Sequence, residues 1–373
     1  MSTSKNSRKL RLLATVAVCL LASSVIYAGL FGDEKVKIPM KIPSEINIED
    51  LHSMAILPVD SDQDARVVLA LEEQIVQVKG ESLELVNEQT LIDRMREQEA
   101  LLVSIERNSS YLHEHGAKLG IDALIFGWVR DLRIEDMHGT KNVKVSRKET
   151  YYNSEGKKKK RTVTEKIPAP KVTRQGHLSM SLGLYDTRSG SILIQKEIVK
   201  ARTHVQVFHD KAKKEDKIPL PSEREVEYDL IADAATEFVH AIVPYTEVKK
   251  VVWDGGCNCD DEGKMVKKGK LEEAEERLRT RLEKRIANVK KRRKDKGKDK
   301  KMAGNYYNLG LIEEIRGDLE GALALYQQAK VANKKPAKHI KKGHKRVEAL
   351  IAQWQVYNGQ GGEMLSQTTV SGE

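Results

Sequence analysis

Two cysteines close together, Cys257 and Cys259, are the side chains best suited to chemistry, and aspartates stand on both sides of them. Thiolates and carboxylates bind metal ions, but a structural zinc site takes four ligands and these cysteines supply two. One close pair is also not the disulfide framework of a small secreted domain. Two alternatives remain open: a surface loop flanked by Gly255 and Gly256, which is the simpler interpretation, and a local disulfide.

The histidines do not form a recognisable site. His113 and His115 are two positions apart in a predicted helix, so their side chains point to different faces and cannot bind one ion together. The chain contains no phosphate-binding loop, nucleophile elbow or zinc-protease helix motif. The sequence therefore predicts a protein that is not an enzyme and that uses no cofactor or metal.

The chain is basic, with 65 Lys and Arg against 55 Asp and Glu and a net charge of +10. Two blocks hold much of the excess, and such blocks are either solvated segments or sites that attract polyanions. Neither block has aromatic residues that could stack on bases, so the predicted polyanion is an anionic lipid or polymer and not a nucleic acid. The first block is Lys157, Lys158, Lys159, Lys160 and Arg161, and the second, within 290–301, contains Lys291, Arg292, Arg293 and Lys294.

The first 32 residues have the pattern of a segment that directs export. Residues 1–11 contain four basic residues and no acid, and an uncharged apolar run follows from Leu12 to Gly32. This pattern is typical of a cleaved signal peptide, with a cleavage site at Ile26-Tyr27-Ala28, and its length also suits an uncleaved membrane anchor. Both alternatives predict that the rest of the chain is exported to the periplasm or cell envelope.

Strands and helices alternate over the first half of the chain, which predicts an α/β domain whose sheet is partly parallel. Later segments alternate apolar and polar residues around short turns, which predicts antiparallel strands. The fold class expected is therefore α/β (α+β) with a mixed sheet over 51–254, after a polar linker at 33–50. The predicted strands are 53–59, 83–86, 122–130, 143–152, 161–167, 177–186, 192–204 and 247–253, and the predicted helices are 63–78, 88–102, 109–119 and 222–243.

Beyond Cys259 the pattern predicts helices only. Residues 255–302 are expected to form a charged linker and an amphipathic helix, 303–356 a helical hairpin region, and 357–373 a disordered tail. Seven residues fall at the offsets of a tetratricopeptide repeat (TPR), with small residues where two helices cross and Gly317 at the turn. One repeat cannot bury its own face, so we expect about two repeats and a capping helix that together hold a partner. The seven are Tyr306, Leu309, Gly310, Gly317, Ala322, Tyr326 and Ala329.

Several phrases between residues 53 and 190 are shared with one family. They are Leu57-Pro58-Val59, Leu85-Val86-Asn87-Glu88-Gln89, the run from Leu119 to Gly127, and the run from Leu184 to Gly190. In these the chain resembles the CsgG-type (curli assembly and transport) family and its TolB-N-like relatives. The resemblance implies an α/β core and a periplasmic or outer-membrane-associated assembly protein.

The secretion channels of this family are lipidated and insert hairpins into the outer membrane, and this sequence departs on both points. Val18 stands before Cys19 where lipidation wants a small residue, and the hairpin at 143–167 contains the first basic block. Charged residues are costly on the lipid-facing side of a membrane hairpin. We therefore expect an exported, non-enzymatic scaffold that holds a protein partner, with polyanion or lipid binding as the alternative and a channel component as the least favoured. A homo-oligomer is left open.

Overall fold

The computed structural model describes residues 35–62, 65–78, 83–86, 90–91, 120–291 and 299–368, without the side chains of 289–291 and 360–368. The chain divides into two compact units. The helical unit comprises residues up to Pro43 together with Tyr245–Val356, and the sheet unit comprises Ser44–Pro244 and the residues from Tyr357 onward. The predicted export segment at 1–32 and most of the two helices predicted within 88–119 lie outside the described residues.

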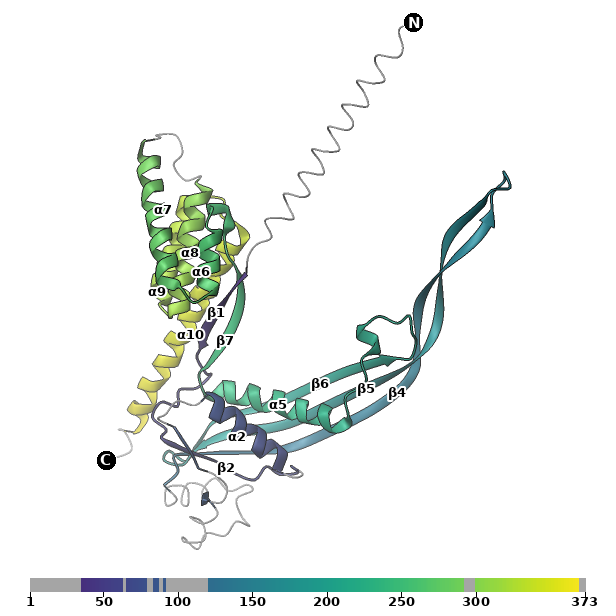
Figure 1. Ribbon diagram of the computed structural model, residues 1–373. Coiled ribbons are helices and arrows are strands. Elements are labelled where there is room, and N and C mark those ends of the chain that lie inside the picture. The colour runs from purple at the N-terminus through teal and green to yellow at the C-terminus, as the bar shows by residue number, and fades with distance from the viewer. Residues whose placement is uncertain are drawn as a thin grey trace. The chain divides into compact units, whose positions relative to one another are not determined.

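The sheet unit contains a mixed five-stranded sheet in the order β3-β2-β4-β5-β6 (Figure 1). Strand β2 pairs in parallel with both β3 and β4, whereas β4–β5 and β5–β6 are antiparallel. This confirms the predicted mixed sheet. The strands are β2 (Ser53–Ile56), β3 (Glu84–Val86), β4 (Ala123–Tyr152), β5 (Lys158–Asp186) and β6 (Ser191–Val207).

Helices α2 (Arg66–Val78) and α5 (Glu223–Ile242) lie against one face of this sheet (Figure 1). Helix α5 begins with a capping box, in which Ser222 Oγ accepts from the Glu225 backbone N–H at 3.2 Å and the Glu225 carboxylate accepts from Ser222 N–H at 2.6 Å. Its apolar stripe, including Val226 and Leu230, is fully buried. The stripe approaches the sheet at Gly176, where an added Cβ would lie 2.6 Å from Val226 Cγ1.

Strands β4 and β5 run far beyond the sheet. They contain 30 and 29 residues, but β6 pairs with β5 only between Lys171 and Asp186. Residues 143–167 therefore form a two-stranded ribbon, called the arm here, that ends in the predicted turn at 153–156. The sequence predicts strands 122–130 and 143–152 as separate elements, yet they are one strand. Residues 135–142 lack apolar alternation because all of them are exposed.

In its described residues, the helical unit combines a β-ribbon with five α-helices. Strand β1 (Lys35–Ile42) pairs antiparallel with β7 (Tyr245–Val252). The helices are α6 (Asp260–Lys267), α7 (Leu271–Lys291), α8 (Lys300–Arg316), α9 (Leu319–Ala332) and α10 (Lys338–Thr368). Within the described residues, no helix is both long and apolar enough to cross a membrane.

Three boundaries predicted from the sequence are wrong. Residues 35–42 are strand β1 and not a linker, because Val36, Ile38 and Met40 alternate into the core while Pro39 points outward on a ribbon edge, where a missing N–H is tolerated. Strand β7, predicted as part of the 51–254 domain, belongs to the helical unit. Residues 357–368 continue α10 although they have no apolar stripe, because extending an existing helix is far easier than starting one.

Candidate functional site

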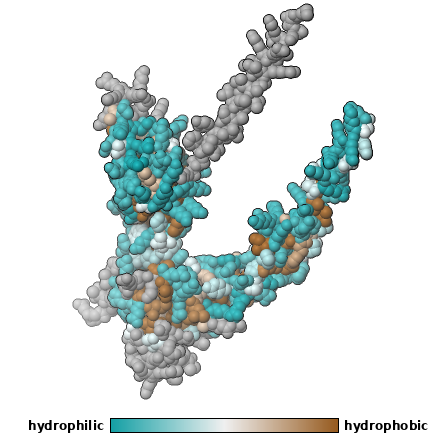
Figure 2. All heavy atoms as spheres, in the orientation of Figure 1, coloured by the Kyte–Doolittle hydropathy of each residue, from teal (hydrophilic) through white to brown (hydrophobic). Residues whose placement is uncertain are grey.

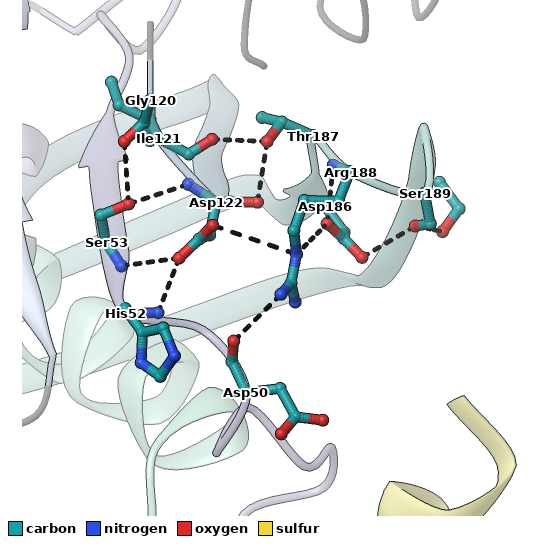
Figure 3. Close-up of polar contacts among 11 residues, drawn as sticks. Asp50, His52, Ser53, Gly120, Ile121, Asp122, Asp186, Thr187, Arg188 and Ser189 are labelled. Carbon is teal, nitrogen blue, oxygen red and sulfur yellow. Dashed lines mark hydrogen bonds and ion pairs between the residues drawn. The ribbon is translucent and has the colours of Figure 1, made fainter. Parts of the chain in front are cut away.

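Residues 120–122 and 186–189 meet the start of β2 at one end of the sheet (Figure 3). The Asp122 carboxylate accepts from the backbone N–H groups of His52 and Ser53, at 2.7 and 3.0 Å. Thr187 Oγ1 donates to the carbonyl of Ile121 at 2.5 Å and lies 3.1 Å from that of Asp122. These bonds connect the start of β2, the start of β4 and the end of β5. Asp122 therefore has a structural role, because its carboxylate ties the start of β4 to the start of β2.

The adjoining Asp186–Ser189 turn is equally self-contained. Ser189 Oγ donates to the Asp186 carboxylate at 2.8 Å, and the Arg188 guanidinium reaches the Asp50 carbonyl at 3.1 Å. The polar atoms of this turn are used by neighbouring strands and turns (Figure 3). The polar groups at this end of the sheet therefore serve strand registration.

The two cysteines lie in the core of the helical unit. The structure joins Cys257 to Cys259 in a disulfide with a Cα–Cα separation of 5.3 Å, and the two residues are only 5% and 0% exposed. Trp253 Nε1 donates to the Cys259 carbonyl at 2.8 Å, and Asn308 of α8 exchanges two hydrogen bonds with the Asp254 backbone at 3.0 Å. Burial excludes the surface-loop alternative. Asn308 holds the link between β7 and α6, which contains the disulfide, against α8.

The residues at tetratricopeptide offsets are also in this core. Leu309 and Tyr326 are 1% and 0% exposed, and Ala322 and Ala329 are fully buried. Gly310 lets the Tyr326 ring cross α8, since a Cβ there would lie 2.6 Å from Tyr326 Cε1, and Gly317 ends α8 with a φ of +86°. Only Tyr306 is half-buried. Burial therefore excludes direct contact between the other side chains and a partner, because α8 is enclosed on all sides and not on one stripe.

A buried ion pair, absent from the sequence predictions, connects α8 to α10. The Arg346 guanidinium binds the Glu314 carboxylate through two bonds of 2.6 and 2.7 Å, and Tyr326 Oη donates to the same carboxylate at 2.6 Å. Burial raises the pKa of Tyr326, and the Glu314 charge raises it further, so the phenol stays a donor. In the sequence, Glu314 is one of two adjacent glutamates and stands two residues after Ile312 and directly before Ile315.

A pocket of ≈ 430 Å³ in the sheet unit opens where α2 and α5 begin beside β4. Its charged groups are engaged: Arg66 pairs with Glu227, and the Asp62 carboxylate accepts from the Val67 backbone N–H at 2.9 Å as an N-terminal cap of α2. Burial raises the pKa of Asp62. Among the described residues, no group of three or more His, Cys, Asp or Glu side chains could hold a metal ion.

The arm contains the first basic block and is the strongest candidate site. Between Lys144 and Lys166 it has nine basic and three acidic residues, a net charge of +6. In Figure 2 the outer part of the arm is hydrophilic, and apolar side chains gather where it leaves the sheet. That apolar base has a small core of Val143, Ala169, Val207 and Ala212. An isolated two-stranded ribbon has little core of its own, so a long polar one is an unusual element for a stable domain to keep.

The register of the arm sorts its side chains onto two faces, because residues directly opposite each other point to the same side. One face, called the paired face, contains both Arg residues and two of the three acids. Arg147 lies 2.9 Å from Glu149 and 3.2 Å from Glu165. Arg161 binds Glu149 at 3.1 Å and stacks over the Tyr151 ring at 5.6 Å. The third acid, Glu155, pairs with Lys157 in the turn at 3.2 Å.

The opposite face is called the lysine face here. The structure describes every residue from 143 to 167, and no acidic residue lies on this face. Each of its ten residues is exposed, whereas Val143, Val145, Glu149 and Val163 of the paired face are buried or half-buried. Ser146 and Thr164, whose hydroxyls are 2.9 Å apart, confirm that the opposite residues share this face. Its five lysines, none of which has an ion pair within the described chain, are Lys144, Lys148, Lys158, Lys160 and Lys166.

The predicted basic patch is thus divided. Lys158 and Lys160 belong to the lysine face, Lys159 and Arg161 to the paired face, and Lys157 to the turn. Sequence reasoning missed Lys144, Lys148 and Lys166, which alternation along two strands could have indicated. In the second block, Lys291 is the last residue of α7, and Arg292, Arg293 and Lys294 lie outside the described residues.

No protein-family model matches the chain, and no curated protein matches it. Among solved structures, the chain shows structural similarity to lipoprotein GNA1162 from Neisseria meningitidis, with 11% identity over 43% of this chain and 87% of that one and a TM-score of 0.23. It also shows similarity to the PelC dodecamer from Paraburkholderia phytofirmans, with 9% identity over 54% of this chain and 96% of that one and the same TM-score of 0.23. Likenesses this weak say nothing about what this chain binds or how it assembles.

Proposed function

We propose that this chain is an exported, non-enzymatic binding and scaffold protein of the cell envelope, of the CsgG-like kind, that holds a protein partner in an envelope assembly. The observation that carries the proposal is the arm. Its residues 143–167 continue two strands past the last contact with β6, and most of their side chains are exposed. Such a ribbon adds little to the core of the sheet unit, so its length is best explained by contacts with something else.

The helical unit supplies a second surface for a protein partner. Since α8 is enclosed, a partner contacts the outer sides of the later helices, where Val331 of α9 is 75% exposed and Val356 of α10 is 64% exposed. Our proposal is therefore that partner binding uses side chains other than the buried residues at the TPR offsets. Export is supported by the basic and apolar pattern of residues 1–32.

The direct test is crosslinking in intact cells. A photoreactive residue replaces Tyr152, which is 70% exposed at the end of the arm, and a matched chain bears it at Tyr228, which is 56% exposed on α5. We expect mass spectrometry to identify one or more envelope proteins, or a second copy of this chain, crosslinked at Tyr152 and not at Tyr228. Equal yields at both positions, or no crosslinked protein at Tyr152, would contradict the proposal.

A second candidate function has its own observation. The arm carries a net charge of +6, and five of its lysines share one face without an ion pair in the described chain. This favours binding of a polyanion through the arm.

A further inference from the structure

The lysine face keeps like charges next to one another. Lys144 and Lys166 are directly opposite in the register, and Lys158 and Lys160 are next neighbours on the same side of β5. Like charges directly opposite each other destabilise a sheet, and no acid lies on this face to offset them. By contrast, the paired face of the same ribbon alternates Arg and Glu. An anion that lies along the lysine face would remove this repulsion, and it would displace no existing ion pair.

The shape of the lysine face indicates what kind of anion fits. The lysine face extends from the Lys144–Lys166 pair to the Tyr152–Lys158 pair, which is eight steps along each strand and corresponds to about 26 Å at roughly 3.3 Å per residue. The width is that of two strands, about 5 Å between backbones. The strands also wind around each other along the arm (Figure 1). A flat membrane meets only part of a narrow, twisted stripe, whereas a linear polymer can follow it.

The side chains between the lysines indicate which chemical class of linear anionic polymer fits this face. Ser146, Thr150, Thr162 and Thr164 place hydroxyl groups along the same face. Hydroxyls donate to carboxylates, they both donate to and accept from sugar hydroxyls, and lysines attract carboxylates as point charges. Single-stranded nucleic acid is bound on series of aromatic side chains, and this face has one, Tyr152.

From these observations we infer that the lysine face of the arm binds a linear acidic polysaccharide lengthwise, with its carboxylates on the five lysines. The inference rests on the proposed binding role of the arm, and it names the chemical class of one ligand that the arm binds. It assigns Lys144, Lys148 and Lys166 to the site, although they are remote from the basic block in sequence. It excludes Lys159 and Arg161, although they belong to that block.

The test uses the full chain and fluorescently labelled polygalacturonate at low salt. One variant combines Lys148→Gln, Lys158→Gln and Lys160→Gln on the lysine face. The matched control combines Lys159→Gln, Lys213→Gln and Lys214→Gln, which removes the same charge from exposed lysines of the same unit that lie off the face. We expect the first variant to bind about tenfold or more weakly, the control to change by less than about threefold, and binding of the wild-type chain to fall steeply with salt. Far-UV circular dichroism checks that both variants keep the sheet.

Three results would overturn the inference: no binding of polygalacturonate by the wild-type chain, equal weakening in both variants, or tighter binding to a competitor. The competitors are a single-stranded oligonucleotide of equal charge and phosphatidylglycerol vesicles. The outcome is separable from that of the crosslinking experiment. Crosslinked protein at Tyr152 without polymer binding would support the scaffold function and contradict this inference. Polymer binding without a crosslinked protein would support this inference and contradict the scaffold function.

Discussion

The molecule contains two sets of Arg–Glu contacts with opposite surroundings. In the helical unit, the Glu314 side chain is 0% and the Arg346 side chain 17% exposed, and they meet at 2.6 Å. On the arm, the Arg147 side chain is 60% and the Glu165 side chain 48% exposed, and they meet at 3.2 Å. Water and salt screen the second pair and barely reach the first. Arginine and glutamate therefore have different structural roles in the two places.

The difference shows how burial sets the role of a charge. The buried pair fixes how α8 and α10 pack, because either charge alone would be left without solvent or partner. The exposed pairs contribute little stability, but they consume both arginines and both acids of one face. The lysines opposite are left available. The four predictions below test this contrast in order of expected effect.

The largest effect is expected for Glu314→Gln. It leaves the Arg346 guanidinium buried and unpaired, which lowers the free energy of unfolding by about 3–5 kcal/mol. Urea unfolding would be followed by tryptophan fluorescence in a Trp128→Phe background, where the remaining Trp253 and Trp354 both report on the helical unit. The double change Glu314→Met with Arg346→Met should recover most of the loss. If Glu314→Gln lowers the unfolding free energy by less than about 1 kcal/mol, the buried pair does not differ from the exposed pairs.

Gly310→Ala should destabilise the same core through sterics. The new Cβ would lie 2.6 Å from Tyr326 Cε1, and displacing that ring also weakens its bond to Glu314. Overpacking of this kind costs about 1–3 kcal/mol, measurable with the same fluorescence. Gly359→Ala is the control, since an added Cβ there meets nothing within 4 Å and alanine favours a helix. If both substitutions destabilise equally, close packing at Gly310 is not the cause.

Glu165→Gln on the arm should change the unfolding free energy by less than about 1 kcal/mol, since its pair with Arg147 is exposed. Urea unfolding followed by circular dichroism would measure this. The result is to be compared with that of Glu314→Gln. Comparable losses of unfolding free energy at the two sites would mean that burial does not separate the two sets of contacts.

The smallest effect concerns pH. The hydrogen bond from Arg161 lowers the pKa of the Glu149 carboxyl below its ordinary value, and Arg147 adds to this. A lowered pKa in the folded state means that the contact stabilises the arm above the ordinary pKa and is lost as the pH falls through the lowered one. NMR titration of the Glu149 carboxyl should show a midpoint that moves upward in Arg161→Gln and stays unchanged in Arg174→Gln. An unmoved midpoint in Arg161→Gln would show that this pair does not exist in solution.

Local patterns predicted much of the fold. Apolar residues at helical spacing predicted α5 to within a residue at each end. Alternation predicted β5 and β6 near the sheet. These predictions are correct because caps, turns and periodicity act over a few residues. Strand β1 was missed because its partner, β7, lies about 200 residues away in the chain, and only that pairing makes its alternation meaningful.

The candidate site shows the same division. The sequence by itself determined the charge of the arm, the turn at 153–156 and the absence of stacking aromatics in the block. Tertiary structure decided which lysines share a face, because a slip of one residue in the register would move every side chain of one strand to the other side. It also decided that Glu314 is a buried partner of Arg346 and not another surface acid. The burial of Glu314 depends on contacts between segments that are distant in the chain, and no local pattern contains those contacts.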